Sequence, residues 1–561
     1  MLGGNGSCSP RDDPETAARH AAVMAVGTLL SRITGFLRYA SLAYVLGLTL
    51  QYGRTNLPST YNLANTLPNM IFDLVMGGII GSLFIPVFVE YLSTRSEEEA
   101  WHVASSVINI SVLVLLVVTV VGMIIAPHII RLMTVFGTYS TQEVTTDVVR
   151  AEAAFFLRFF LPQIIFYGLS AIFGGLLNSY RHFTVPAFAP IANNVVVILT
   201  VVLFRLLPGA RDDRLHMTVL ATGTTLGVMA QALVHLPALV RQGIRYRLVL
   251  DARHPAIRKI GRLSIPLLGY IFLWQVGTWF LFSLAIRVDG GVPSYQYAQL
   301  FFMLPYGVFA VSVITALFPS LSERAARGNT EGFREILNGG LRSTMVAIFP
   351  FFVLYLTLSI PIIRLLLEHG FFKSGDTELL AGVLLFFSLA LVPYSLDMLA
   401  TKAFYAMQDT KTPMINNCFV VVVNMTSNYL LFRLMGVKGL ALGFSITYLF
   451  AMLLDGTVLR FRVGGLGGKK LVRTFSRVAI ASAAMAGVTY ASFLAVEKLL
   501  SPGLPRDFLA LAIPASLGLA CYVGMGILLG MEELRLLGRM IYRFLPARQG
   551  SHLAQPGPGE R

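Results

Sequence analysis

Most of this chain consists of apolar stretches that are each long enough to cross a lipid bilayer. A helix needs about 20 mostly apolar residues to span roughly 30 Å of hydrocarbon. Fourteen such stretches follow one another along the 561 residues, of which 55% are hydrophobic and 13% charged. We expect spans at approximately 21–48, 60–92, 100–126, 150–178, 184–205, 216–240, 260–287, 295–321, 333–360, 378–407, 412–435, 437–459, 473–496 and 508–531.

The pattern within these stretches indicates helices. Backbone polar groups in hydrocarbon must form their hydrogen bonds within the segment or in a closed barrel. The alternating ten-residue strands of a barrel do not occur in the sequence. The sequence therefore predicts an all-α integral membrane protein with fourteen transmembrane helices.

Basic residues concentrate on one set of loops, which predicts the orientation by the positive-inside rule. The two most basic connections, between spans 6 and 7 and between spans 12 and 13, are expected in the cytoplasm. With an even number of spans, both termini are then cytoplasmic. Because the net charge of +15 sits on short loops and not on a soluble domain, no nucleic-acid partner is expected.

Short motifs recur at a nearly constant distance along the chain. Ile129-Ile130-Arg131-Leu132 returns as Ile362-Ile363-Arg364-Leu365, a shift of 233 residues. Farther on, the segment Tyr167-Gly-Leu-Ser matches Tyr394-Ser-Leu-Asp, and the pair Asn193-Asn194 matches Asn416-Asn417. We interpret this as two six-helix lobes of the same orientation, as in parallel-repeat transporters, followed by two additional spans.

The expected domain organisation follows from the repeat and the basic loops. It comprises a cytoplasmic tail (1–20), an N-lobe with spans 1–6 (21–240), a basic cytoplasmic linker (241–259), a C-lobe with spans 7–12 (260–460), a basic loop (461–472), spans 13–14 (473–531) and a cytoplasmic tail (532–561).

Polar residues form a stripe along the second span. Asn62, Asn65, Thr66, Asn69 and Asp73 fall at helical spacing on one narrow face. Such groups are costly against lipid, so they must face protein or a watery cavity. We favour the wall of a substrate cavity; interhelical hydrogen bonding is the alternative.

The first span carries two arginines, Arg32 and Arg38, well inside the apolar stretch. A guanidinium keeps its charge and offers a planar fork of donors that suits phosphate oxygens. We predict that both bind an anionic substrate, with pyrophosphate as the expected ligand type. A structural pair of Arg32 with Asp73 is the alternative, and Arg38 could extend to the outer surface.

The second half contains fewer intramembrane charges. Tyr394, Asp397, Thr401 and Tyr405 share one face of span 10, and Asn424 and Asn428 stand one turn apart in span 11. We predict a gating or ion-linked role for Asp397, Asn424 and Asn428. For Asp397 the alternative is a structural carboxylate paired with Lys402 or with a loop, and for the two asparagines it is ordinary helix packing.

Catalytic signatures are absent from the sequence. It contains no GxSxG, HExxH or P-loop motif, and its histidines and cysteines do not occur at metal-ligand spacing. We therefore expect no enzyme, no catalytic residue, no cofactor and no metal site.

Three segments carry a family resemblance: SRITGFLR at 31–38, YNLANTLPNMIFDLVMGGIIGSLFIPVFVEYL at 61–92 and YAQLFFMLPYGVFAVSVITALFPSLS at 297–322. They resemble the MurJ/MviN family, the lipid II flippases of bacterial peptidoglycan synthesis, within the superfamily of multidrug, oligosaccharidyl-lipid and polysaccharide exporters. The resemblance implies a bacterial plasma-membrane protein with a V-shaped pair of lobes around a central cationic cavity. It would move undecaprenyl-pyrophosphate-linked disaccharide-pentapeptide from the cytoplasmic to the outer leaflet by alternating access.

By position, Arg32 and Arg38 match the family's two span-1 arginines. This chain departs from many members at Ser59, Asp73, Gly77 and Leu300, which occupy positions of an acidic residue, an arginine, a glutamate and an arginine, respectively. The resulting cavity would be less basic, and the LANTLPN pattern with its downstream acid and double glycine is similar to the actinobacterial branch.

Net transport also requires that binding differ between the two states of the cycle. We expect a secondary-type transporter whose cycle is biased by a monovalent cation or the membrane potential, with lipid II, the bilayer and cell-wall synthesis proteins as partners. The alternatives are an exporter of another polyprenyl-linked glycan or of a small cation, and a non-transporting scaffold for wall-synthesis enzymes.

Overall fold

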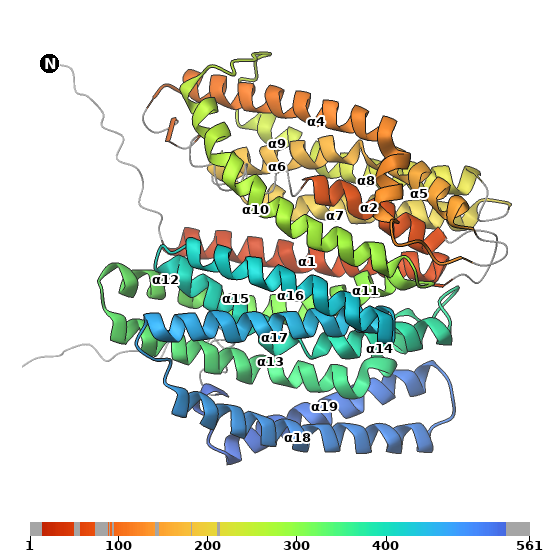
Figure 1. Cartoon of the computed structure of the whole chain (residues 1–561), viewed down its shortest axis with the longest axis vertical. Coiled ribbons are helices and arrows are strands. Elements are labelled where there is room, and N and C mark those ends of the chain that lie inside the picture. Colours follow the sequence, from red (N-terminus) through yellow and green to blue (C-terminus); the bar gives the residue numbers. More distant parts are fainter. Residues whose placement is uncertain are drawn as a thin grey trace, which may run out of the picture. The chain divides into compact units, whose positions relative to one another are not determined.

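The computed structural model describes residues 14–49, 57–72, 88, 90–91, 95–140, 145–180, 182–209 and 214–534. Within these ranges every regular element is a helix (Figure 1). The elements are α1 (Pro14–Leu46), α2 (Leu57–Phe72), α4 (Glu97–Met133), α5 (Thr146–Phe160), α6 (Gln163–Ser179), α7 (Thr184–Leu206), α8 (Arg214–Leu233), α9 (Leu236–Arg241), α10 (Pro255–Ala285), α11 (Gly291–Pro305), η3 (Tyr306–Ala310), α12 (Val311–Ala326), α13 (Thr330–Leu367), α14 (Ser374–Ser388), α15 (Leu391–Ala406), α16 (Lys411–Met435), α17 (Val437–Arg462), α18 (Gly468–Leu499) and α19 (Leu504–Leu528).

The predicted all-α membrane fold is confirmed. Each of the fourteen predicted spans overlaps a helix, and for 60–92 most residues after α2 lie outside the described ranges. Among the described residues, ten helices are long and apolar enough to cross a membrane, or up to eleven if the bent pair α14–α15 is one span. The chain is therefore a multi-pass membrane protein, and the count of fourteen spans stays a prediction.

Several predicted spans are interrupted where the sequence suggested one continuous helix. The break between α5 and α6 falls at Leu161 and Pro162, where proline lacks the amide that a continuing helix needs. A bend of 45° separates α14 from α15. Within α13, Leu358 has non-helical dihedral angles and marks a kink. A π-helical turn, η3, lies between α11 and α12.

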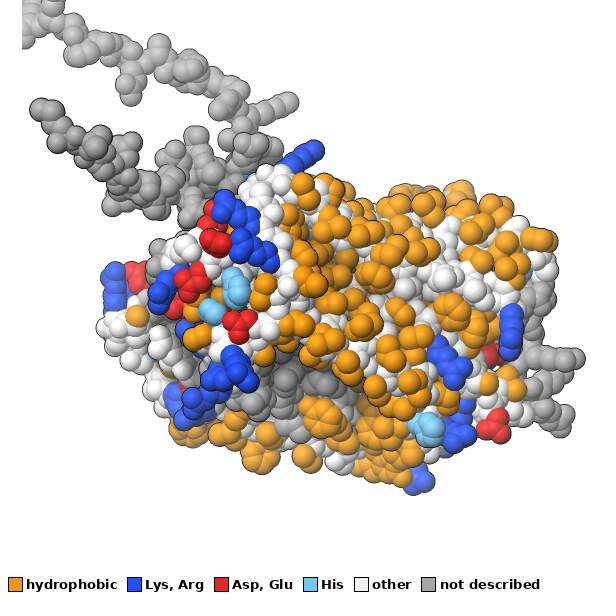
Figure 2. All heavy atoms as spheres, turned by 90° about the horizontal axis from the view of Figure 1, so that it is seen from above, with side chains coloured by type: hydrophobic (Ala, Val, Ile, Leu, Met, Phe, Trp, Pro, Cys, Tyr) orange, Lys and Arg blue, Asp and Glu red, His pale blue; other side chains and the backbone are white. Residues whose placement is uncertain are grey.

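The surface of α4 shows how the chain meets the bilayer. Its middle exposes Val117, Val120, Val121 and Ile124. Its first turn carries acidic residues, of which Glu98 pairs with Arg247 at 2.8 Å. Figure 2 shows the same division on one face of the molecule, with apolar side chains across the middle and charged ones gathered toward the ends. This distribution fits a helix whose apolar length lies in hydrocarbon.

The chain forms two compact units. The first comprises Met1–Phe301, Ile360–Phe387 and Asn417–Thr447, and the second comprises Phe302–Ser359, Ser388–Asn416 and Tyr448–Arg561. In the first unit, α1 packs against α7, α7 against α8, and α2 against α5. In the second, α12 packs against α15, and α18 lies beside α19 (Figure 1). The predicted lobes, 21–240 and 260–460, divide the chain differently and stay a prediction.

The positions of equivalent helices agree with the internal repeat. The two longest helices, α4 and α13, begin at residues 97 and 330, the same shift of 233 that separates the repeated Ile-Ile-Arg-Leu motif near their ends. The paired asparagines lie near the middle of α7 in the first half and near the start of α16 in the second.

Candidate functional site

The first-span arginine Arg38 lies among tyrosines of the first unit. Its guanidinium carbon is 4.9 Å from the ring centroid of Tyr39. Tyr61 and Tyr167 lie within electrostatic range of the same guanidinium. Nε of Arg38 is buried and forms no hydrogen bond with the described residues. The side chain thus keeps a fixed charge and an N–H donor beside aromatic hydroxyl groups, an arrangement that suits an anionic oxygen.

The tyrosines around Arg38 come from four helices, α1, α2, α6 and α11. Tyr61 of α2 is buried and its hydroxyl is 3.0 Å from Oγ1 of Thr224 in α8. Tyr297 of α11 packs edge-on against Tyr39, with ring centroids 5.3 Å apart. Because Tyr39 and Tyr61 are held by contacts with neighbouring helices, these contacts position the part of α1 that carries Arg38. Arg32, six residues earlier in α1, is half-buried.

The polar stripe of α2 is satisfied mainly by its own helix. Asn62 donates to the carbonyl of Pro58 at 2.7 Å, and Asn69 donates to that of Asn65 at 3.0 Å. Gln296 of α11 donates to Oγ1 of Thr66 at 2.6 Å. The last contact is the interhelical hydrogen bonding that the sequence left open as an alternative.

One acceptor of the stripe remains without a donor. Oδ1 of Asn65 is buried and receives no hydrogen bond from the described residues. Asp73, the fifth member of the stripe, and Gly77 lie outside the described residues. Of the other two departures from the family pattern, Ser59 is fully buried and Leu300 is half-buried. The predicted substrate-binding roles of Arg32, Arg38, Asn62, Asn65, Asn69 and Asp73 stay predictions.

The asparagines of span 11 contact each other and the next helix. Asn428 donates to Oδ1 of Asn424 at 3.0 Å, and Asn424 donates to Oγ1 of Thr447 at 3.2 Å. Gly443 of α17 lies so close to Asn428 that an added Cβ would collide with its Oδ1. Small residues allow this close approach of two membrane helices. The contacts belong to helix packing, and the ion-linked role of both asparagines stays a prediction.

Asp397 of α15 is brought to a second carboxylate, Asp455 of α17, in the second unit. The two carboxyl groups are within hydrogen-bonding contact. Asn416 of α16 donates to Oδ1 of Asp455 at 2.6 Å, and Thr401 donates to Oδ2 at 3.4 Å. Lys402, the partner considered from the sequence, lies with Nζ 5.5 Å from the ring centroid of Tyr405.

Asp455 was not among the residues predicted from the sequence. A signal was present, because a lone acidic residue near the end of a predicted apolar span is rare. That it faces Asp397 depends on how α15 and α17 are rotated against each other.

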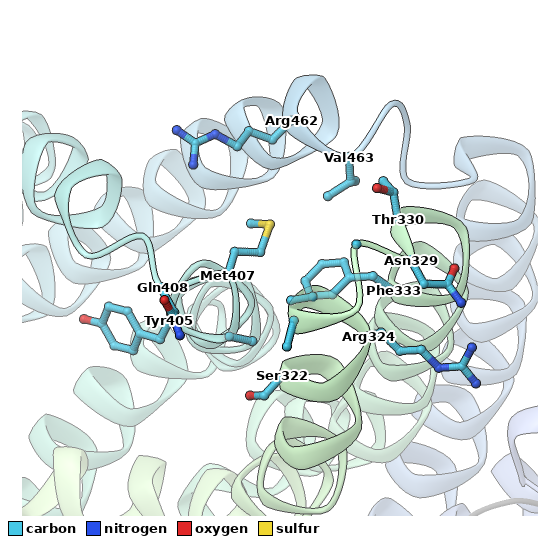
Figure 3. Close-up of a pocket in the computed structure, with 14 residues that line it drawn as sticks. Ser322, Arg324, Asn329, Thr330, Phe333, Tyr405, Met407, Gln408, Arg462 and Val463 are labelled. Atoms are coloured by element: carbon cyan, nitrogen blue, oxygen red, sulfur yellow. The ribbon is translucent and has the colours of Figure 1, made fainter.

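A cavity of about 690 Å³ opens in the same unit, at the ends of α12, α15 and α17 (Figure 3). Its lining includes Arg324, Asn329, Tyr405, Gln408 and Arg462, so the polar part of the wall carries two cations. Arg462 pairs with Asp409 in the loop after α15. By the positive-inside rule this end of the helices is the predicted cytoplasmic side.

The described residues offer no group of three or more His, Cys, Asp or Glu side chains that could hold a metal ion.

Comparison with known proteins places these features in a family. The family model described as "Lipid II flippase MurJ" matches residues 51–522. A probable lipid II flippase MurJ of Vibrio cholerae is 25% identical over 91% of this chain and 95% of its own length. One from Rhizobium tropici is 28% identical over 93% and 96%, respectively.

Solved structures share the fold. A lipid II flippase MurJ in an inward closed conformation has a TM-score of 0.73 at 24% identity and covers 93% of this chain and 100% of its own. An inward-facing multidrug resistance transporter of the MATE family has a TM-score of 0.62 at 16% identity, covering 77% and 95%. Because the family model covers most of the sequence, the chain belongs to the MurJ family of lipid II flippases.

Proposed function

We propose that this protein moves lipid II, the undecaprenyl-pyrophosphate-linked peptidoglycan precursor, from the cytoplasmic to the outer leaflet of the bacterial plasma membrane. Family membership supports the reaction, and the surroundings of Arg38 supply the chemistry on which the proposal depends. A guanidinium whose buried Nε forms no hydrogen bond with the described residues, and which lies beside tyrosine hydroxyl groups, can bind pyrophosphate oxygens.

In the proposed cycle the pyrophosphate headgroup enters from the cytoplasm and binds Arg32 and Arg38 of α1. The polyprenyl chain stays in the lipid, because its surface is apolar. The headgroup then becomes accessible from outside when the helical halves rearrange, as in alternating access. Binding must differ between the two states for net transport, so an ion or the membrane potential has to bias the cycle.

The proposal is tested with the variant Arg38→Ala in two settings. One is a strain depleted of its own lipid II flippase. The other is liposomes that contain the purified variant, in which lipid II movement is measured. We expect a loss of roughly tenfold or more in flipping rate, because a charge-assisted contact to phosphate disappears. Arg38→Lys separates charge from fork geometry and should recover only part of the rate.

Arg433 provides the matched control. It also stands beside a tyrosine, with its guanidinium carbon 5.4 Å from the ring centroid of Tyr429, but it is exposed at the end of α16. Arg433→Ala should flip lipid II at the wild-type rate. Unchanged flipping by Arg38→Ala would contradict the role of this arginine. A wild-type protein that moves no lipid II in liposomes would instead favour a scaffold.

A further inference from the structure

We propose that Asp397 and Asp455 form a proton-binding site that holds one shared proton and whose loading and release accompany the transport cycle. The inference rests on the function proposed above, because it assigns the ion that this cycle requires. It is carried by the contacts of the pair, by the equivalent positions in the first half of the chain and by a cavity one helical turn away.

The pair is buried in the second unit, where α15, α17 and the first residues of α16 meet. Asp397 is 4% exposed and Asp455 is 6% exposed. Asp455 receives hydrogen bonds from Asn416 of α16 and Thr401 of α15. Oδ1 of Asp397, by contrast, is buried and receives no hydrogen bond from an N–H or O–H group of the described residues. The site therefore satisfies one carboxylate and leaves the other short of a donor.

A shared proton resolves this shortage. Two carboxylates in contact within a buried site repel each other, and their charges are poorly solvated there. When one of them is protonated, its O–H becomes the donor for the other, and the pair carries a single negative charge. The amide of Asn416 and the hydroxyl of Thr401 then stabilise the oxygens that remain ionised.

The first half of the chain contains the same cluster without charges. The repeat matches Ser170 to Asp397 and Asn193 to Asn416. In α8, Gln231 contacts both of these side chains, as Asp455 does in α17. Gln231 donates to Oγ of Ser170 at 3.3 Å, and Asn193 donates to Oε1 of Gln231 at 3.4 Å.

In the first half, neutral side chains thus link the three corresponding helices, α6, α7 and α8. Helix packing alone does not require acids at the equivalent places, where burying them is costly. We therefore assign proton exchange to the two carboxylates of the second half, because a hydroxyl and an amide cannot perform it.

The cavity at the ends of α12, α15 and α17 gives the pair a route to water. Tyr405 lines this cavity and lies one helical turn beyond Thr401, about 6 Å along α15. Figure 3 shows Tyr405 and Gln408 together at the end of this helix. A proton entering from the predicted cytoplasmic side would therefore cross only one turn of α15 before reaching Asp455.

Among the described residues, no cation acts electrostatically on the pair. Tyr394 lies within electrostatic range of Asp397, and Tyr405 within range of Asp455. Tyr306 of η3 and Tyr448 of α17 pack on the ring of Tyr394. From α12, Ile314, Leu317 and Leu321 join the apolar cluster that covers α15. Lys402 is directed to Tyr405. The net charge of the pair therefore depends on whether it holds a proton.

The first experiment detects the proton without any transport. Infrared difference spectra of purified wild type and Asp397→Asn/Asp455→Asn at pH 7 should show that the wild type has one additional protonated carboxyl group. The variant Asp397→Ser/Asp455→Gln, which installs the residues of the first half, should show the same loss and should fold, because these residues already pack in that setting. Glu323→Gln, which removes an exposed carboxylate of α12, should retain the band.

Two results would overturn the site. If neither double variant loses a protonated carboxyl signal, both acids are ionised. If added Na⁺ at constant pH abolishes the signal in the wild type, the pair is a sodium site and not a proton site.

The second experiment measures coupling in liposomes. A pH gradient should change the rate of lipid II flipping by wild type and Glu323→Gln by about tenfold, within the range usual for coupled sites. The rate of either double variant should be independent of the gradient. Equal gradient dependence in all proteins would refute coupling. A wild type that has the carboxyl signal but moves no lipid II would refute the proposed function and leave the proton site standing.

Discussion

Asp376, in the first turn of α14, accepts hydrogen bonds from the backbone amides of Leu48 and Thr49, which follow the end of α1 more than 300 residues earlier in the chain. The distances are 3.3 and 3.2 Å, and the amide of Lys373 donates to the same carboxylate at 3.2 Å. The carboxylate is fully buried. It therefore fixes the end of α1 to a segment of the second half within the same compact unit.

Asp376→Asn should destabilise the protein by about 1–3 kcal/mol, because one acceptor oxygen and the charge that strengthens these hydrogen bonds are lost. Thermal unfolding in detergent or nanodiscs measures the effect. Glu378→Gln, two residues later on the exposed side of the same helix, is the control and should unfold with the wild type. Equal melting of both variants and wild type would show that the carboxylate contributes nothing net.

The last two helices depend on an ion pair. Glu533 is 3% exposed. Its carboxylate accepts hydrogen bonds from Arg342 of α13 at 2.7 Å and from Thr474 of α18 at 3.2 Å. Glu533→Gln should lower stability by about 2 kcal/mol, because Arg342 is left partly buried without its counterion. The exposed neighbour Glu532→Gln should have no effect. Limited proteolysis of the α18–α19 hairpin would report the loosening directly, and unchanged cleavage would refute it.

Helices α7 and α8 meet at a glycine. A Cβ on Gly223 would collide with the side chain of Thr200. Gly223→Ala should therefore cost about 1–3 kcal/mol through overpacking. The second substitution Thr200→Ala should restore part of the loss, because it removes the colliding atoms. Gly487→Ala, in open space on α18, is the control for added helix propensity. Absence of rescue would place the strain elsewhere.

The loop before α16 gives a pH dependence. Hydrogen bonds from Thr412, and then the nearby guanidinium of Arg462, hold the pKa of Asp409 below its usual range. Because this pKa is lowered, the ionised carboxylate stabilises the folded protein at pH values above the ordinary aspartate pKa of about 3.9. This stabilisation is lost as the pH falls through the lowered pKa. Melting temperatures of wild type and Asp409→Ala should differ at neutral pH and converge in acid. Asp147→Ala, at the exposed start of α5, should follow the wild type throughout.

Hydropathy was sufficient to predict the fold as helical spans, because a helix that crosses a bilayer has to be apolar over its thickness. The breaks within them were not predicted. Pro162 offered a signal, but the kink at Leu358 and the bend between α14 and α15 depend on tertiary packing.

The site was predictable one helix at a time. Periodicity assigned Asp397 to the same face as Thr401, and the structure places both side chains toward Asp455. Which residue of α17 they would meet depends on the rotation and depth of that helix, and no periodicity in one segment determines these quantities. The same limit applies to Arg38, whose neighbours Tyr61 and Tyr297 come from two other helices.

The π-helical turn η3 has a consequence for how this span can be altered. A π turn accommodates one extra residue, so the side chains that follow it point about 100° away from where an uninterrupted α-helix would aim them. Removing a single residue from Tyr306–Ala310 would restore the regular winding and re-aim every side chain of α12 at once. Which face of α12 packs against α15 therefore depends on the length of the segment Tyr306–Ala310 as much as on the sequence of α12.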